Sequence, residues 1–435
     1  MTTTCASRTA LLAFLALALA WPAPDARAAG FTNIDIGVRR MGMFSVMGKP
    51  DDATAIFHNP AGMTLQEGTR FYHSQSWFVV DLGIRLYDSS GVLHPDHEIK
   101  PSWNVGAIPF IGIVSDVGTK DLRIGFGVYA PNAYGASLPE DEATRYHVTS
   151  ALFLASRATA SIAYRFTPKF SAGASFHVIN VYLKATRYMN ALVLANPDRR
   201  FDDPAKTTTA DSDARLDITG GAWTWAWDVG LLFEPLPTLK FGAQFASGSA
   251  ITLKGGATLT PKHGPVQRAD QSTDMSLPFS LRAGVNWEFY PGFELAGDIY
   301  WWHYQVMQEQ RTVLSQPIMG LNGFVDPKNY HNAWAWNLGF LYRPLPELEL
   351  MTGFQMDDTP MPSNTYTLDN PTTQQYGIGL GIRWQCSDDV RLGLAMVRNW
   401  FQMLDVQTSV GTPPSNFKGH GSNFEVGFDI DWRFL

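Results

Sequence analysis

Long apolar runs are missing from this chain once its first 28 residues are set aside. A helix that crosses a bilayer needs about 20 consecutive, mostly apolar residues. No later stretch of the 435-residue sequence meets that requirement. The sequence therefore argues against a helical membrane protein.

Cysteine and basic blocks are scarce as well. Cys5 lies in the N-terminal leader, so Cys386 is the single thiol of the mature chain, and we expect no internal disulfide and no cysteine-based metal site. Removing Arg8, Asp25 and Arg27 with the leader takes the formal net charge from −7 to −8. An acidic chain without a basic block argues against a nucleic-acid partner.

The serine-hydrolase elbow Gly-x-Ser-x-Gly is also absent, although the chain has ten histidines and many serines. A lipase or protease needs such a nucleophile site or a pair of acids in defined positions. We therefore predict no enzymatic activity, no metal and no cofactor.

The leader, residues 1–28, reads as a secretory signal peptide. Its apolar run extends from Leu11 to Trp21, and Ala26-Arg27-Ala28 supplies a small-x-small cleavage pattern. The run is too short to span a bilayer well, and an anchor helix that stays in place is the alternative. We expect cleavage after Ala28 and export into a bacterial cell envelope.

Aromatic residues are abundant, with 14 Trp, 15 Tyr and 27 Phe. The mean hydropathy is nevertheless slightly polar, at −0.11. That combination is typical of a transmembrane β-barrel, where apolar and polar side chains alternate and cancel in any average.

The alternation is visible in the C-terminal stretch NFEVGFDIDWRFL. One face carries Phe424, Val426, Phe428, Ile430, Trp432 and Phe434, and the other carries Glu425, Gly427, Asp429, Asp431 and Arg433. A period of two places apolar side chains on one face of a strand. Strands of soluble sandwiches run about 5–6 residues, whereas these have the length that a tilted strand needs to cross a bilayer.

Fourteen such strands are expected, and the connections between them alternate between short and long. The candidate strands are about 69–81, 103–115, 121–134, 151–166, 170–188, 221–234, 238–255, 277–290, 293–307, 331–343, 347–358, 373–386, 389–405 and 421–434. Bacterial outer-membrane barrels have an even strand number, short periplasmic turns and long extracellular loops. The sequence therefore predicts an all-β fold, an antiparallel transmembrane barrel of about 14 strands over residues 69–435.

Residues 29–68, here called the hatch, do not fit that pattern. Pro50 suits a first helical position, with Asp51 and Asp52 at the positive end of the helix dipole. Pro60 pushes Asn59 out of the helical region, so the Asn59 side chain can cap the next turn. We expect a helical plug in the barrel lumen. A disordered periplasmic linker is the alternative.

Several stretches taken together resemble a known family. They are Ala29-Gly30-Phe31, Gly37-Val38-Arg39-Arg40, Asp51-Asp52, Asn59-Pro60-Ala61, LRIGFGVYAPNAYG, Arg145-Tyr146, ATASIAYRF, GLLFEPLPTLKFGAQFAS, SLPFSLRAGV and GFQMDDTPMP. In this order they resemble the FadL/TodX family of outer-membrane transporters for long-chain fatty acids and aromatic hydrocarbons. The likeness covers nearly the whole mature chain.

The resemblance implies passive uptake of hydrophobic small molecules across the outer membrane, with ligand captured at the extracellular loops. It assigns Gly30, Phe31, Asn59, Pro60 and Ala61 to a hatch inside a fourteen-stranded barrel. It also implies a kinked third strand through which ligand leaves sideways into the membrane.

In this chain the third strand is about 121–134, where Gly125, Gly127 and Pro131 suit a kink. The alternative is that Pro131 only ends the strand.

Arg157 is the first candidate to bind a ligand carboxylate. It lies on the polar side of its strand with Thr159 and Arg165, and therefore faces the lumen. The alternative is an ion pair with a lumen acid such as Asp228. Arg145 and Tyr146 are further ligand-binding candidates.

Two other functions remain open. A general diffusion porin shares the barrel but lacks an N-terminal plug, and a surface adhesin would use the long loop 189–220. A closed barrel needs no partner subunit, so we expect a monomer surrounded by outer-membrane lipid.

Overall fold

The computed structural model describes residues 32–88, 90–93, 97–102, 104–190, 213–368, 373–411 and 413–434. The signal peptide, Gly30, Phe31 and most of the loop 189–220 lie outside these residues. Within them no helix has the length and apolar character needed to cross a bilayer.

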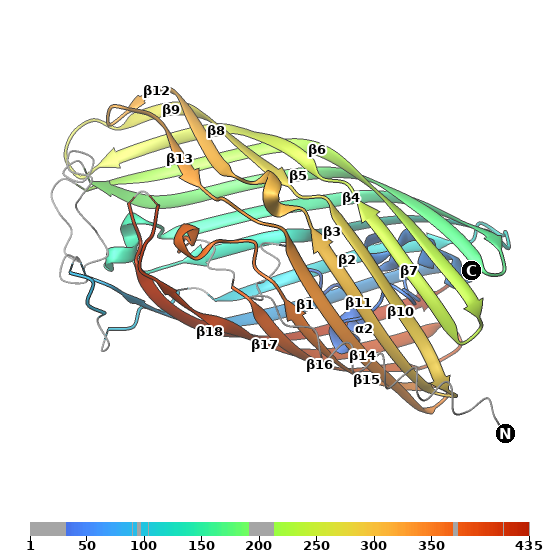
Figure 1. The fold of residues 1–435 in the computed structure, drawn as a ribbon. Helices are drawn as coiled ribbons and strands as arrows, with labels where there is room; N and C mark the ends of the chain where they lie inside the picture. Colours follow the sequence, from blue (N-terminus) through green and yellow to red (C-terminus); the bar gives the residue numbers. More distant parts are fainter. Residues whose placement is uncertain are drawn as a thin grey trace.

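A closed antiparallel ring of fourteen strands forms the body of the molecule (Figure 1). Its strands, in order around the ring, are β1 (Thr69–Leu86), β2 (Val105–Ser115), β3 (Leu122–Ser137), β4 (Ser150–Thr167), β5 (Phe170–Asn190), β6 (Asp213–Leu236), β7 (Leu239–Ala246), β10 (Ser280–Tyr290), β11 (Phe293–Trp302), β14 (Ala333–Leu345), β15 (Leu348–Asp357), β16 (Gln375–Gln385), β17 (Val390–Val406) and β18 (Phe417–Arg433). Pairing of β1 with β18 closes the ring. The fourteen-strand prediction is confirmed.

Four further strands extend the sheet beyond the ring, and we call them the canopy. They are β8 (Ser249–Pro261), β9 (Gln267–Leu277), β12 (Glu309–Ile318) and β13 (Leu321–Pro327), paired in the order β6–β8–β9–β12–β13. β8 joins the early part of β6, where Gly221 pairs with Lys254. In Figure 1 the canopy lies at the end of the barrel opposite the short turns.

The canopy corrects two expectations. The strand expected over 238–255 is two strands, because the chain leaves the ring at Ser247-Gly248. There the Ser247 hydroxyl oxygen accepts a hydrogen bond from the Trp227 backbone N–H at 2.8 Å. The connections expected over 256–276 and 308–330 are mostly strand, since the period-two pattern continues past the membrane.

Aromatic rings gather on the outward face of the ring. One row runs Trp227–Phe245–Phe279–Trp301–Trp334, with neighbouring ring centroids 5.2 to 6.3 Å apart. Within the run Tyr300 to Tyr304, Trp301 belongs to this outer row, whereas Tyr300 and Trp302 are buried in the lumen. The run therefore serves both the lipid interface and the lumen, because successive strand residues point to opposite faces.

The hatch occupies the lumen. It contains α2 (Val38–Met43), α3 (Ala55–His58) and the 3₁₀ helix η1 (Pro60–Leu65), all but one of whose residues are buried. α2 contacts the strands β14 to β18, and η1 contacts β3 to β6 on the other side of the barrel. Figure 1 shows α2 enclosed by the strands. The plug prediction is confirmed.

Glycines in the wall make room for the hatch. A Cβ on Gly242 would lie 1.7 Å from the Met47 carbonyl oxygen, and one on Gly230 would lie 2.1 Å from Asn59 Oδ1. The same crowding occurs at Gly339 and Gly353, where an added Cβ would lie 2.4 Å from the Met43 carbonyl oxygen. The hatch backbone therefore packs directly onto the strand backbone, which only residues without a side chain permit.

We expect Gly242→Val to displace the hatch while the barrel still closes, because the added side chain overlaps the Met47 carbonyl. Ion conductance in planar bilayers should rise. Gly256→Val is the matched control, since a Cβ there meets no atom within 4 Å. Equal conductance of the two variants would contradict the proposed docking role of Gly242.

Candidate functional site

The motif Asn59-Pro60-Ala61 joins two turns of the hatch. Asn59 Oδ1 accepts a hydrogen bond from the Ala61 N–H at 3.2 Å, which confirms the predicted cap. The Asn59 amide also donates to the Leu231 carbonyl of β6 at 3.0 Å and to the Met47 carbonyl at 3.3 Å. One side chain thus caps η1 and fixes the hatch to the wall.

Six charged residues form a closed circuit at the other side of the hatch, here called the charge ring. In order they are Arg39, Asp51, Arg383, Glu349, Arg343 and Glu294, each paired with the next and the last with the first. The N···O distances include 2.8 Å for Arg39–Glu294, 3.0 Å for Arg383–Asp51 and 2.6 Å for Arg383–Glu349. Two members belong to the hatch and four to β11, β14, β15 and β16.

The acidic pair of the hatch therefore does not begin a helix, because α3 starts only at Ala55. Asp51 binds Arg383, and Asp52 accepts the Thr54 N–H at 2.9 Å and lies 3.5 Å from Arg383. Burial alone raises the pKa of Asp51, but the guanidinium groups of Arg383 and Arg39 outweigh it and hold the pKa well below its usual range. Asp51 is thus a lasting anion in the charge ring.

A second acidic residue of the wall holds the hatch backbone. Asp298 of β11 accepts the N–H groups of Val46 and Met47 at 2.7 and 3.1 Å. The same oxygen accepts the Tyr300 hydroxyl at 2.9 Å. The hatch is therefore tied to β11 through its backbone as well as through its charges.

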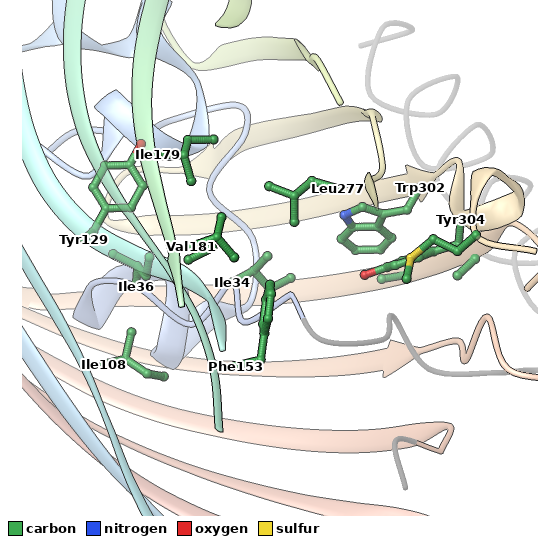
Figure 2. Packing of buried hydrophobic residues seen from close by; sticks show 14 of the residues in the cluster. Ile34, Ile36, Ile108, Tyr129, Phe153, Ile179, Val181, Leu277, Trp302 and Tyr304 are labelled. Atoms are coloured by element: carbon green, nitrogen blue, oxygen red, sulfur yellow. The ribbon is translucent and has the colours of Figure 1, made fainter. Parts of the chain in front are cut away.

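Apolar side chains of the hatch and the wall pack together in a buried cluster, here called the apolar chamber. Ile34 and Ile36 of the hatch belong to one buried cluster with Phe153, Ile179 and Val181 of the wall. Figure 2 shows these side chains together with Leu277, Trp302 and Tyr304 from the strand ends. A long apolar ligand could bury its chain against these side chains. Burial stabilises it by about 25 cal/mol per Å² of apolar surface removed from water.

A small polar cavity of about 20 Å³ adjoins this chamber. Its lining includes Arg157, Asp228, Arg282, Trp302 and Phe57. Donor groups here have no hydrogen-bond partner among the described residues, namely Arg157 Nε, Arg282 Nε and Nη1, and Trp302 Nε1. Buried donors without partners are costly, so this arrangement favours an anionic or carbonyl oxygen ligand.

Arg157 lies where the sequence predicts, on the lumen side of β4. It donates to Asn132 Oδ1 at 2.9 Å. Asp228, the expected alternative partner, lies 2.9 Å from His177 Nε2 and accepts the Gln244 amide at 3.1 Å. Arg157 has no ion pair to Asp228 within the described residues, and its role as a ligand-binding residue stays a prediction.

The wall is incomplete between β2 and β3. Among the described residues the ladder joining these strands ends at the pair Phe110–Tyr129. Beyond that pair β2 still bonds to β1 and β3 to β4. The next link is the Ser102 N–H to the Ser137 carbonyl, at 2.8 Å. We call the unpaired interval the β2–β3 gap.

Prolines lie next to the last pair on both strands. Pro109 precedes Phe110, and Pro131 follows Tyr129 by two residues. Proline has no N–H to donate to a ladder. β3 carries a bulge here, since the pairing shifts between Tyr129–Arg157 and Asn132–Ala155. The Asn33 N–H of the hatch donates to the Pro131 carbonyl at 2.7 Å, so the hatch lines the gap edge.

Gly125 and Gly127 lie below the gap, in the paired part of β3. A Cβ on Gly125 would lie 2.7 Å from Met63 Sδ, and one on Gly127 would lie 3.4 Å from Ile56 Cγ2. These glycines face the hatch, and the irregularity of the strand lies at Pro131.

Arg145 and Tyr146 lie on the 3₁₀ helix η2 (Ala143–Tyr146) in the connection between β3 and β4. Arg145 pairs with Asp213 at 3.3 Å, and the Tyr146 hydroxyl donates to Asp213 at 3.1 Å. Their bonds to Asp213 fix the start of β6, and neither residue lines the polar cavity. Their ligand role stays a prediction.

A second cavity of about 130 Å³ opens under the canopy. Apolar and basic side chains both line it, including Leu183, Leu216, Phe324, Arg187 and Lys328. Sequence reasoning missed this site and Arg282. The visible signal for Arg282 was an arginine on the lumen side of SLRAGVNWEFY, the same signal that selected Arg157. No group of His, Cys, Asp and Glu able to hold a metal occurs among the described residues.

Comparisons with known proteins agree on one family. The profile described as outer membrane protein transport protein (OMPP1/FadL/TodX) matches residues 19–434. A long-chain fatty acid transport protein of Shigella flexneri is 22% identical over 452 residues, covering 97% of this chain and 98% of that protein. The protein of the same name from Escherichia coli K12 is 21% identical with the same coverage.

Solved structures share the fold. A FadL homologue of Pseudomonas aeruginosa superposes with a TM-score of 0.81 at 16% identity, covering 94% of this chain and all of that one. The toluene transporter TodX of P. putida gives 0.69 at 17% identity, covering 93% of this chain and 99% of that one.

We expect Arg383→Met to loosen the hatch, because it leaves Asp51, Asp52 and Glu349 without their shared cation. Breaking a buried pair from one side costs about 3–5 kcal/mol, so the urea midpoint for hatch release should fall and conductance should rise. Arg311→Met, which removes an exposed pair with Glu309, is the control. An unchanged midpoint for Arg383→Met would show that the charge ring does not hold the hatch.

Proposed function

The chain belongs to the outer membrane protein transport protein family (OMPP1/FadL/TodX), and on that premise we propose that it takes up long apolar molecules bearing one carboxylate. It is a transport protein of the outer membrane and not an enzyme. In this proposal ligand enters beneath the canopy, settles in the apolar chamber with its head group in the polar cavity, and leaves through the β2–β3 gap.

The observation that carries the choice of substrate is the polar cavity. Arg157 and Arg282 face a single carboxylate there, that of Asp228, so the lining of the cavity carries one more positive than negative side chain. Opposite charges about 4 Å apart attract by about 4 kcal/mol at an effective dielectric of 20. A monoanion therefore complements the cavity, whereas a neutral aromatic hydrocarbon leaves the arginine donors unpartnered.

A sideways exit agrees with the physical chemistry of such a ligand. The long axis of the lumen is blocked by the hatch, which the charge ring and Asp298 hold in place. The β2–β3 gap adjoins the apolar chamber, since Ile108, Phe110, Tyr129 and Phe153 belong to the same buried cluster. An apolar tail that leaves by the gap passes from protein to lipid without contacting water, so no energy input is required.

The oligomeric state and the start of the hatch are also proposed. The ring closes within one chain, so we propose a monomer with lipid around its outward face. Gly30 and Phe31, which lie outside the described residues, are proposed to belong to the hatch, whose first described residue, Thr32, forms a bridge with Asn132.

Cross-linking the gap tests the exit route. In a Cys386→Ser background, Ala107→Cys with Ala133→Cys places thiols on the two unpaired strand segments, and a cleavable bismaleimide should abolish oleate uptake. Cleaving the linker should restore it. The control pair Ile113→Cys with Phe126→Cys lies in the paired ladder and should transport with the linker in place. Full uptake by the linked gap pair would rule out this exit.

Uptake of labelled oleate and toluene tests the substrate. Arg157→Leu should lower oleate uptake by about tenfold or more, since a hydrogen bond to a charged group contributes about 1.5–3 kcal/mol, and should change toluene uptake less than twofold. Arg311→Leu on the outer face of the canopy is the control. Negligible uptake of both ligands by the wild type, together with high ion conductance, would indicate a porin instead.

A further inference from the structure

Guanidinium groups and aromatic rings alternate in a stack that crosses the lumen. The Arg40 guanidinium carbon lies 5.1 Å from the Phe44 ring centre and 5.8 Å from that of Tyr300. The Arg282 guanidinium carbon lies 5.5 Å from the Tyr300 ring and 5.1 Å from the Phe57 ring. The order is therefore Phe44, Arg40, Tyr300, Arg282 and Phe57, with three members in the hatch and two in the wall.

Arg282 occupies a special place in that stack. It is 6% exposed, it lines the polar cavity, and within the described residues its guanidinium makes no ion pair. Its Nε and Nη1 have no hydrogen-bond partner. The faces of Phe57 and Tyr300 lie against its guanidinium, and the Asp228 carboxylate lines the same cavity.

The strengths of the competing interactions are close. A single cation–π contact is on average somewhat weaker than a hydrogen bond between charged groups. A carboxylate that offers two oxygens to Arg282 can therefore outweigh its two ring contacts. The guanidinium would turn toward the head group and away from Phe57.

Phe57 leads from Arg282 to the edge of the gap. Its ring packs edge-on against Tyr129, with centroids 5.4 Å apart. Tyr129 in turn stacks on Phe110 at 5.3 Å, and these two residues form the last pair of the β2–β3 ladder. Phe57 therefore links the stack to the rim of the gap.

We infer that Arg282 and Phe57 couple head-group binding to opening of the β2–β3 gap. This inference rests on the proposed uptake of monocarboxylates. Bound carboxylate draws Arg282 off Phe57, Phe57 loses one of its ring contacts with Arg282, His58 and Tyr129, and the Tyr129–Phe110 pair loses part of its support from the hatch. By reciprocity, a gap held open favours carboxylate binding. Arg282 binds ligand, and Phe57 is a positioning residue that acts through Tyr129.

Distance measurement across the gap tests the coupling. Spin labels on Ala107→Cys and Ala133→Cys, in the Cys386→Ser background, report the separation of β2 and β3 by pulsed electron resonance. Saturating oleate should shift the distance distribution of the otherwise native protein to longer values. Methyl oleate, which has the same tail without the charge, should leave it unchanged.

Variants separate coupling from a structural role. Phe57→Leu keeps apolar bulk but removes the ring, so at saturating oleate its distance distribution should no longer respond. Phe57→Tyr keeps the ring and should recover the oleate response. A Phe57→Leu protein that responds like the parent would overturn the coupling, as would an equal response to methyl oleate.

Isothermal titration with oleate separates failure of the proposed substrate from failure of the coupling. Absence of oleate binding by the spin-labelled parent would defeat the proposed substrate. Oleate binding without a distance change would defeat the coupling alone. Heat-modifiability on gels confirms that each variant retains a folded barrel, so loss of response cannot be assigned to unfolding.

Discussion

The hatch can stay inside the barrel only because its buried charges are answered by charges of the wall. Transfer of a single unpaired ion from water into a protein interior costs several kcal/mol even after relaxation. Arg39 and Asp51 avoid that cost by joining Glu294 and Arg383, and the circuit closes through Arg343 and Glu349. Without these pairs, unpaired charges would be buried both on the hatch and on the inner face of the wall. The hatch and the wall thus compensate each other's buried charges.

The compensation of buried charges also divides the lumen into a part that fixes the hatch and a part that is proposed to bind ligand. Charges on one side, at α2 and the following loop, fix the hatch, while apolar contacts and the Asn59 bonds hold η1 against β4 to β6. The chamber and the polar cavity lie where charge compensation is incomplete, with two arginines facing one aspartate. The proposed ligand site therefore lies where the structural ion pairs stop.

Sequence patterns predicted the parts of this architecture that depend on local rules. Period-two alternation identified all fourteen ring strands, and Asn59-Pro60 identified a capped turn, because both follow from backbone geometry. The canopy was missed as a separate element since β8 alternates like a membrane strand. The lumen glycines were read as part of the polar face, and only the close approach of Met43 and Met47 explains them. The period-two pattern places Arg282 on the lumen side of its strand, but its contacts with Phe57 and Tyr300 are not predictable from that pattern, because these rings are distant in sequence from each other.

The prolines beside the β2–β3 gap bear on how fast the wall can respond. Pro109 and Pro131 offer no N–H, so neither residue can donate to a ladder across this interval of the wall. Widening the gap then breaks few backbone hydrogen bonds and needs mainly rotation of rings such as Tyr129 and Phe110. Side-chain rotation is intrinsically faster than the unzipping of a ladder. Ligand passage through the proposed exit would therefore depend on rotation of aromatic side chains and not on repeated breakage and re-formation of the sheet.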